Sequence, residues 1–248
     1  MSGLVLVTSA GKRVGAGIAK RLAADGWTIA VHYNSSRDGA ESVATEIKAA
    51  GGAADVFSAD LADDGATAGL CAALASRGDW VGLVNSAASF TPDSITDFAY
   101  AAAATQLRLN LIAPVFLARK LGESIAPGKS GFVINIADQK VLNPNPDFLS
   151  YTLAKTGLAH ATAPLAMALA PRVRVNCIAA GLMLISGDQS AENFAQVHNN
   201  NLTQVGTPVA DVADAVAFLA KAENITGALL PVDGGQHLVP SARDVMFD

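Results

Sequence analysis

The sequence has 248 residues, of which 51% are hydrophobic and 16% are charged, and its formal net charge is −5. This acidic balance, with no basic run longer than Lys12-Arg13, excludes the cationic surface that nucleic-acid binding requires. No stretch of about twenty residues stays apolar without an interruption by glycine or a polar or charged residue, so we expect no membrane span. The first apolar run has no basic segment ahead of it and is about as long as a strand, so we expect a cytoplasmic location.

Predicted strands and helices alternate from the start of the chain. Short β-branched runs predict strands at 4–8, 27–33, 53–59, 81–84, 131–136, 173–178 and 229–232. Apolar residues at helical spacing predict helices at 14–24, 38–50, 63–76, 96–125, 150–169 and 209–220. This alternation is typical of right-handed crossovers on a parallel sheet. We therefore expect an α/β fold in which residues 1–248 form one Rossmann-like domain, a doubly wound parallel sheet of about seven strands with helices on both faces.

Two segments interrupt this regular pattern. Pro164 lies inside a predicted helix, where proline removes a hydrogen-bond donor, so we expect a kink or a packing reason there. Residues 182–204 are polar and irregular and include Asn199-Asn200-Asn201, which suggests a flexible lid over a substrate site.

The two cysteines and four histidines do not suggest a metal site. Cys71 and Cys177 are widely spaced in apolar surroundings, which is typical of buried free thiols in a reducing compartment. The histidines show no ligand spacing. We therefore expect no metal.

The turn after the first strand has features of a phosphate site. A helix that begins directly after a strand offers free N–H groups and the positive end of its dipole to a phosphate. Gly11 and Gly15 allow close approach of the backbone, although this is fewer glycines than a full dinucleotide fingerprint contains. Lys12 and Arg13 add two cations, which suit the 2′-phosphate of NADPH.

The end of the second predicted strand favours the same cofactor. It reads Tyr33-Asn34-Ser35-Ser36-Arg37 and lacks the acidic residue that would bind the ribose hydroxyls of NADH. Small hydroxyl and amide donors, with a cation beside them, are suited to a phosphate. The sequence thus favours NADPH over NADH.

A tyrosine and a lysine stand four residues apart on the predicted helix 150–169. Side chains at this spacing share one helix face, which brings Tyr151 beside Lys155. A neighbouring ammonium favours the phenolate, so we expect the pKa of Tyr151 to fall below its usual value of about 10. The pair would then exchange a proton near neutral pH.

With Tyr151-x-x-x-Lys155, the chain resembles the short-chain dehydrogenase/reductase family over nearly its whole length. Other family marks appear in order: Asp60-Leu61, Asn85-Ser86-Ala87-Ala88, Asn110, Arg174-Val175-Asn176 ahead of Gly181, and Val232-Asp233-Gly234-Gly235. The resemblance implies that Lys155 holds the nicotinamide ribose and that Asn110 takes part in a water relay. The cofactor-binding residues that it implies, together with the turn and strand end above, are Gly11, Lys12, Arg13, Val14, Gly15, Tyr33, Asn34, Ser35, Ser36, Asp60, Leu61, Asn85, Ala87, Ala88, Tyr151, Lys155, Gly181 and Leu182.

One position departs from the family pattern. The usual catalytic serine stands thirteen residues before the tyrosine, and this chain has Asp138 there. An ionised carboxylate only accepts hydrogen bonds, so it suits a substrate with N–H groups better than a simple ketone. The pteridine reductase branch of the family carries aspartate at this place, and the chain resembles that branch also at Lys12-Arg13, at His32-Tyr33 and at 85–90. The substrate residues so implied are Arg13, Phe90, Asp138, Tyr151, Met183 and Leu184, with Phe90 stacked on the pterin ring.

The resemblance leaves three functions open. The first is hydride transfer from NADPH to a C=N bond of a pterin-like substrate, in which Asp138, Tyr151, Lys155 and Asn110 would act. The second is a carbonyl reductase of the same family, and the third is a non-catalytic protein that senses NADP. Ser9 replaces the first fingerprint glycine and Ala180 replaces a proline, which leaves the strength of cofactor binding open. By resemblance we also expect a homotetramer formed through the apolar helices at 96–125 and 150–169.

Overall fold

The computed structural model describes residues 3–187 and 189–247. Its seven strands are β1 (Leu4–Val7), β2 (Thr28–Tyr33), β3 (Ala53–Ser58), β4 (Trp80–Asn85), β5 (Gly131–Asp138), β6 (Val173–Ala180) and β7 (Leu229–Val232). They form one sheet in the order β3-β2-β1-β4-β5-β6-β7, and every neighbouring pair is parallel. The predicted fold class is confirmed.

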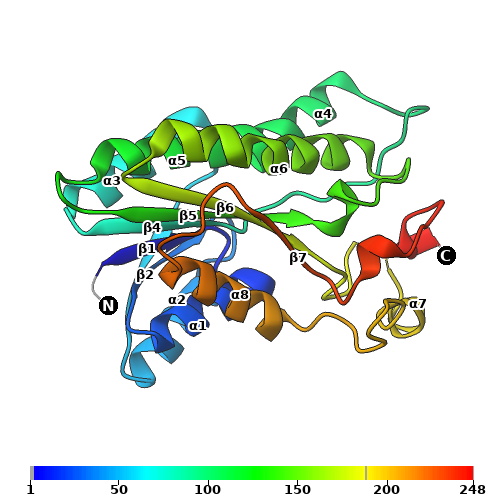
Figure 1. Ribbon diagram of the computed structural model, residues 1–248, viewed down its shortest axis with the longest axis horizontal. Helices are drawn as coiled ribbons and strands as arrows, with labels where there is room; N and C mark the ends of the chain where they lie inside the picture. The colour runs from blue at the N-terminus through cyan, green and yellow to red at the C-terminus, as the bar shows by residue number, and fades with distance from the viewer. Residues whose placement is uncertain (1–2, 188, 248) are drawn as a thin grey trace.

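Helices cover both faces of the sheet. They are α1 (Arg13–Ala24), α2 (Arg37–Ala49), α3 (Asp64–Ser76), α4 (Tyr100–Leu107), α5 (Ala113–Ser124), α6 (Leu149–Leu169), α7 (Ala191–Val197) and α8 (Val209–Lys221). In Figure 1, α1, α2 and α8 lie below the sheet, and α3, α5 and α6 lie above it. Each layer of helices buries its own apolar cluster against one face of the sheet, so the strands read as continuous apolar runs.

The strand order reverses beside β1. The chain proceeds from β1 outward to β2 and β3, then returns to add β4 on the other side of β1. The crossovers after β1 and β4 therefore diverge to opposite faces of the sheet. In an open α/β sheet, the crevice at the carboxyl ends of such strands is where ligands bind.

The predicted helical stretch 96–125 begins later and is not regular. It runs from α4 through a π-helical turn, Arg108–Ile112, into α5. By length and composition, Tyr100–Ser124 is the one helix among the described residues that is long and apolar enough to cross a membrane, which is weak evidence for a span. Its α5 part packs on β4 and α6, the position of a covering helix in this fold. Helix α6 continues through Pro164 as a single element.

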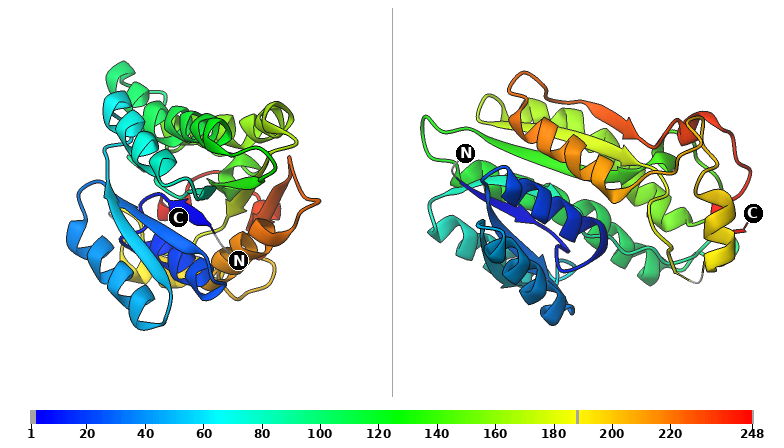
Figure 2. Two further views of the ribbon diagram at one scale, coloured as in Figure 1. Left: turned by 90° about the vertical axis from the view of Figure 1, so that its left-hand side faces the viewer. Right: turned by 90° about the horizontal axis from the view of Figure 1, so that it is seen from below.

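The segment beyond β6 contains structure that the sequence did not predict. Within residues 182–204, which we expected to be irregular, the short helix α7 is formed, and Ser190 caps its first turn through a hydrogen bond from the Asn193 N–H. Residues 241–247, here called the C-terminal strap, end in a 3-10 turn at Val245–Phe247 that contacts α7. Figure 2 shows the strap and α7 together at one end of the molecule.

Candidate active site

Two cavities lie at the carboxyl ends of the strands. The larger, of about 310 Å³, is lined by the turn after β1, the ends of β5 and β6, α6 and the C-terminal strap. The smaller, of about 200 Å³, is lined by the same turn and by the end of β2. Ser9, Lys12 and Ala88 line both cavities, so the two form adjoining parts of one cleft.

The turn after β1 is held in an unusual backbone conformation by a buried histidine. Ser9 has a φ of 55°, in the left-handed region that favours glycine, which explains why the family has glycine at this position. The Ser9 N–H donates to Nδ1 of His32 at 3.1 Å, and Nε2 of His32 lies 3.1 Å from the Ala59 carbonyl. Burial lowers the pKa of His32 to about 4, so the ring is neutral and its Nε2 proton is donated to Ala59. His32 thus joins the ends of β1, β2 and β3.

Gly11 and Gly15 are packed too tightly to carry a side chain. A Cβ on Gly11 would lie 2.9 Å from the Ala40 nitrogen, and one on Gly15 would lie 2.9 Å from the carbonyl carbon of Ser9. Helix α1 begins directly after this turn without a capping side chain or an acidic residue in its first turn. Its first N–H groups are therefore available to an anion.

The smaller cavity is lined by residues that the sequence predicted to bind the cofactor. Its lining includes Gly11, Lys12, Tyr33, Asn34, Ser35, Ser36, Leu61, Ala87 and Ala88, all of which the sequence assigned to the cofactor. No carboxylate is among the described residues that line it. A lysine, three serines and an asparagine at this cavity are the donors that an additional phosphate needs.

Tyr151, Asp138 and Lys155 meet in the larger cavity. The Tyr151 hydroxyl donates to Oδ2 of Asp138 at 3.1 Å. The Lys155 ammonium donates to the Ile136 carbonyl at 2.8 Å and lies 5.8 Å from the centroid of the Tyr151 ring. Helix α6 supplies the tyrosine and the lysine one turn apart, while β5 ends at the aspartate.

The prediction that the pKa of Tyr151 is lowered is wrong for this state of the protein. Burial and the neighbouring Asp138 carboxylate raise the pKa of Tyr151 well above 10. Burial also raises the pKa of Asp138, and it lowers that of Lys155 to about 8. The sequence indicated the ammonium but not that the tyrosine donates to a carboxylate. Tyr151 is therefore a proton donor near neutral pH, and its neighbour Asp138 is the acceptor.

Two contacts position the start of α6 and the loop above it. Ser150 donates through its N–H to Oδ1 of Asp93 at 3.1 Å, so the loop after β4 caps α6 next to Tyr151. Phe90, on the same loop, stacks on Phe148 with ring centroids 3.9 Å apart and meets the Tyr151 ring edge to face at 4.8 Å. Phe90 also lines the larger cavity, and one face of its ring is covered by Phe148.

Most of the other predicted site residues line the larger cavity. They are Lys12, Arg13, Val14, Gly15, Ala88, Gly181, Leu182, Met183 and Leu184. Arg13 has a φ of 52° and donates to the Ile185 carbonyl at 2.7 Å, which connects the phosphate turn to the segment after β6.

Three predicted residues do not line either cavity. Asp60 is exposed and accepts a hydrogen bond from the Ala62 N–H. Asn85 is buried and donates to Asn135 at 2.8 Å. Asn110, in the π-helical turn, accepts from the Ser89 N–H and donates to the Ser89 carbonyl, both at 2.9 Å, so its side chain holds the stretch of backbone that leads to Phe90.

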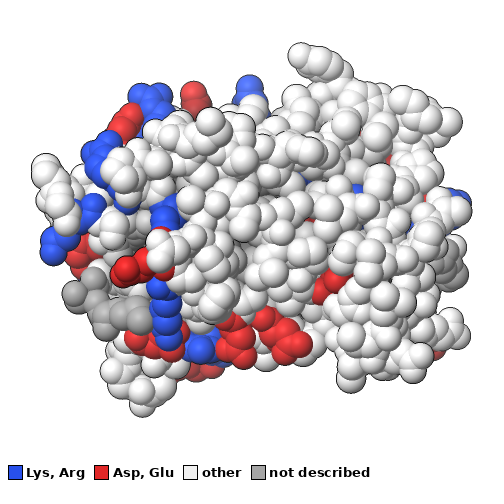
Figure 3. Space-filling view, viewed as in Figure 1, with Lys and Arg blue, Asp and Glu red and all other residues white. Residues whose placement is uncertain are grey.

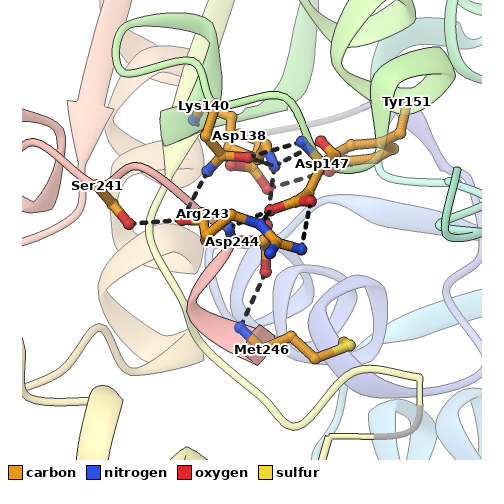
Figure 4. Close-up of polar contacts among 9 residues, drawn as sticks. Asp138, Lys140, Asp147, Tyr151, Ser241, Arg243, Asp244 and Met246 are labelled. Carbon is orange, nitrogen blue, oxygen red and sulfur yellow. Dashed lines mark hydrogen bonds and ion pairs between the residues drawn. The ribbon is translucent and has the colours of Figure 1, made fainter. Parts of the chain in front are cut away.

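The structure adds residues that the sequence did not indicate. Gln139 and Lys140 follow Asp138, and Asp244, Val245 and Met246 come from the C-terminal strap, yet all five line the larger cavity. Figure 4 shows Asp244 and Lys140 beside Asp138 and Tyr151. No motif marks these residues, because the contact between Lys140 and Asp244 joins positions 104 apart in the chain. Among the described residues, no group of three His, Cys, Asp or Glu side chains is placed to hold a metal ion.

Comparison with known proteins agrees with this geometry. The family described as enoyl-(acyl carrier protein) reductase matches residues 10–237. Pteridine reductase 1 of Leishmania tarentolae is 30% identical over 95% of this chain and 96% of its own. The chain belongs to the short-chain dehydrogenase/reductase family. Another family member, 3beta-hydroxysteroid dehydrogenase 1 of Eggerthella lenta, is 32% identical over 95% of this chain and 94% of its own.

A solved structure from the family has the same fold and holds a bound cofactor. FolM alternative dihydrofolate reductase 1 from Brucella canis, complexed with NADP, superposes with a TM-score of 0.88 at 36% identity, over 96% of this chain and 95% of that one. The predicted class of enzyme and the predicted cofactor are thereby confirmed: the protein is an NADP-dependent oxidoreductase of this family. This membership sets aside the alternative of a non-catalytic NADP sensor.

Proposed function

We propose that this enzyme reduces a C=N bond of a pterin-like substrate with NADPH. The observation that carries the proposal is the pair formed by Tyr151 and Asp138, in which the tyrosine hydroxyl donates to a carboxylate at 3.1 Å. A serine at position 138 would donate to a substrate carbonyl. A carboxylate there instead accepts hydrogen bonds from ring N–H groups, which pterins carry.

The proton chemistry follows from the charge states at the site. Raised pKa values keep a proton on the Tyr151 and Asp138 pair near neutral pH. When bound, NADPH supplies the hydride. The pair then provides the proton that a ring nitrogen needs, while the Lys155 ammonium, buried beside the tyrosine ring, stabilises the negative charge that remains.

Residues around the pair provide the ring-binding surface and the cofactor site. Phe90 presents an aromatic face in the larger cavity, and Arg13, Met183 and Leu184 line the same cavity. Lys12, Ser35 and Ser36 at the smaller cavity would hold the 2′-phosphate of NADPH. The relatives named pteridine reductase and dihydrofolate reductase support a substrate of this class.

A ketone is the second candidate substrate. The relative named a hydroxysteroid dehydrogenase is about as similar to this chain as the pteridine reductase is. Tyr151 is a proton donor for a carbonyl oxygen as well, so the tyrosine alone does not distinguish the two substrates. The residue that distinguishes them is Asp138.

Steady-state kinetics with two classes of substrate test the proposal. NADPH oxidation is measured with dihydrobiopterin, dihydromonapterin and dihydrofolate, and in parallel with a panel of flat ketones. We expect turnover of at least one dihydropterin by the wild type, and we expect Asp138→Ser to shift kcat/KM toward ketones by about tenfold or more, since a charged acceptor is replaced by a donor. Turnover of ketones alone by the wild type would refute the pterin proposal.

We also propose that the enzyme is a cytoplasmic homotetramer. Several large apolar side chains of α4, of α6 and of the π-helical turn between α4 and α5 are exposed, among them Tyr100, Ile112, Leu153 and Met167. The face drawn in Figure 3 has few charged side chains over α6, while the charges gather toward the opposite end from the C-terminus. A symmetric contact between helices would cover these residues. Light scattering at micromolar concentration tests the assembly.

A further inference from the structure

The substrate end of the larger cavity is closed by a segment far from the family motifs. Asp244 and Met246 of the C-terminal strap line this cavity together with Asp138 and Tyr151. In Figure 4 the strap crosses beside the end of β5, so that Asp244 lies on the same side as the Asp138 carboxylate. The strap thus forms part of the wall of this cavity.

A network of buried polar groups fixes this wall. The Lys140 ammonium, 2% exposed, donates to Oδ2 of Asp244 at 2.9 Å, to the Asp147 carbonyl at 3.0 Å and to Asn145 at 2.7 Å. The Asp147 carboxylate accepts from the Asp244 N–H at 2.7 Å and from the Arg243 guanidinium at 2.8 and 2.9 Å. All three donors of the ammonium are used, so Lys140 holds the strap in place and has none left for a ligand.

Acceptors dominate the cavity wall that this network builds. Asp138 and Asp244 each present a carboxylate, and each carboxylate oxygen can accept more than one hydrogen bond. Gln139, 9% exposed, lines the same cavity, and its Oε1 has no hydrogen-bond partner among the described residues. An unpaired buried acceptor destabilises the protein until a donor reaches it. Three acceptors together suit a ligand edge that carries several N–H donors.

We propose that Asp244 is a specificity-determining residue, which with Asp138 and Gln139 selects heteroaromatic rings bearing an amino group next to a ring N–H. This inference rests on the proposed reductase function and narrows its substrate class to amino-substituted nitrogen heterocycles. A ring with carbonyl groups at the same edge meets acceptor against acceptor and binds weakly. The selectivity is a property of binding and does not require hydride transfer.

Two probes that differ at position 2 of the ring, and in the hydrogen that N1 carries as a result, test this inference. Pterin carries a 2-amino group, and lumazine carries a carbonyl in its place. Their dissociation constants are measured by fluorescence quenching on the full chain saturated with NADP⁺, for the wild type and for Asp244→Asn. This substitution preserves the size of the side chain but removes its charge, and we expect it to weaken pterin binding about tenfold while changing lumazine binding less than about twofold.

Controls separate selectivity from folding. Asp211→Asn, an exposed site on α8, makes the same chemical change away from the cavity and should alter neither probe. Gln139→Met removes the unpaired acceptor without touching the Lys140 network, and we expect it to weaken pterin binding by about fivefold and lumazine binding much less. Unchanged NADP⁺ affinity in each variant confirms an intact nucleotide site.

The outcomes are distinct from those of the turnover assay. If Asp244→Asn weakens the binding of pterin and of lumazine equally, Asp244 only shapes the cavity wall. If pterin binding is unchanged in both Asp244→Asn and Gln139→Met, neither side chain contacts the ligand. Either result overturns the inference. If no dihydropterin is reduced while the amino-selective loss persists, the proposed reaction is refuted and the binding assignment stands. If a dihydropterin is reduced but neither variant loses pterin binding selectively, the proposed reaction stands and the role of Asp244 in selectivity is refuted.

Discussion

The two cavities of the cleft are built from different kinds of sequence. The smaller cavity uses mainly two short contiguous segments, the turn after β1 and the residues that follow β2. The larger cavity brings Asp138 of β5, Tyr151 of α6 and Asp244 of the C-terminal strap together across more than a hundred positions. A nucleotide's phosphates are recognised by backbone N–H groups of a local turn, whereas the side chains of the larger cavity, where we propose that the substrate binds, are brought together only by the complete fold.

Removal of the Tyr151 hydroxyl, which lies in the larger cavity, should abolish most of the enzyme's turnover. Tyr151→Phe keeps the ring that contacts Phe90 but deletes the hydroxyl that donates to Asp138. We expect kcat to fall at least about a hundredfold while the dissociation constant for NADPH changes less than about twofold, because the proton donor is lost and the smaller cavity is untouched. Stopped-flow kinetics and NADPH fluorescence measure the two quantities. Retained turnover would show that another group donates the proton.

The turn after β1, which borders both cavities, should fail in the opposite way when it is altered. In Gly15→Ala the new Cβ would lie 2.9 Å from the Ser9 carbonyl carbon and 3.0 Å from the Ala10 Cα, so the backbone of the turn must move. We expect a loss of about 1–3 kcal/mol of stability and at least about a tenfold weaker affinity for NADPH. Chemical denaturation and fluorescence titration measure both effects.

A glycine elsewhere provides the matched control. Gly69, on the exposed face of α3, would place a Cβ with no atom within 4 Å, so Gly69→Ala should stabilise the helix by about 0.5–1 kcal/mol and leave NADPH binding unchanged. Tight NADPH binding by Gly15→Ala would show that the turn adapts, and the proposed phosphate site would then need revision.

The contrast between local segments and side chains that only the fold brings together also explains which features could be predicted from the sequence. The turn 8–15, the strand end 33–36 and the Tyr151 and Lys155 pair each depend on local spacing, so their placement at the cleft could be predicted. The alternation of apolar runs was enough to predict all seven strands, because parallel strands buried on both faces have few polar interruptions.

The remaining features depend on tertiary contacts. The direction of the Tyr151 pKa is set by burial and by Asp138, which stands on another element. Lys140, Asp147 and Asp244 show no periodicity or spacing, and their roles follow from contacts between the strap and the residues that follow β5. Helix α7 was missed because it is short and its residues are mostly polar or small, so no apolar periodicity marks it.

His32 gives the smaller cavity a dependence on pH that acts through stability. The pKa of His32 in the folded protein is lowered by burial from 6.5 to about 4. Below pH 6.5 the unfolded chain therefore binds a proton that the folded chain does not, so the unfolding free energy falls as the pH decreases toward 4. Between neutral pH and pH 5 this amounts to about 2 kcal/mol.

Replacing the histidine should remove this dependence. His32→Asn keeps an acceptor near the Ser9 N–H but does not titrate. The unfolding free energy is measured with urea at pH 5 and pH 7, and we expect the difference between the two values to be about 2 kcal/mol smaller in the variant than in the wild type. His160→Asn, at an exposed position on α6, is the control and should retain the wild-type difference. Identical pH dependence in all three proteins would mean that the pKa of His32 is the same in the folded and unfolded states, so that the folded protein also carries this proton at pH 5.

The smallest expected effect tests how firmly the strap closes the larger cavity. Arg243 makes two hydrogen bonds to Asp147, at 2.8 and 2.9 Å, but its side chain is 54% exposed, so water competes with the pair. Arg243→Lys keeps the charge and loses the two-pronged geometry, while the Lys140 and Asp244 contact remains. We expect stability to fall by less than about 1 kcal/mol and KM for the dihydropterin to rise about two- to threefold, with kcat and NADPH affinity unchanged. Arg119→Lys, in an exposed pair with Glu123 on α5, should change none of these quantities. A weaker affinity for NADPH in Arg243→Lys would mean that the strap also supports the nucleotide site, and the separation between the two cavities would not hold.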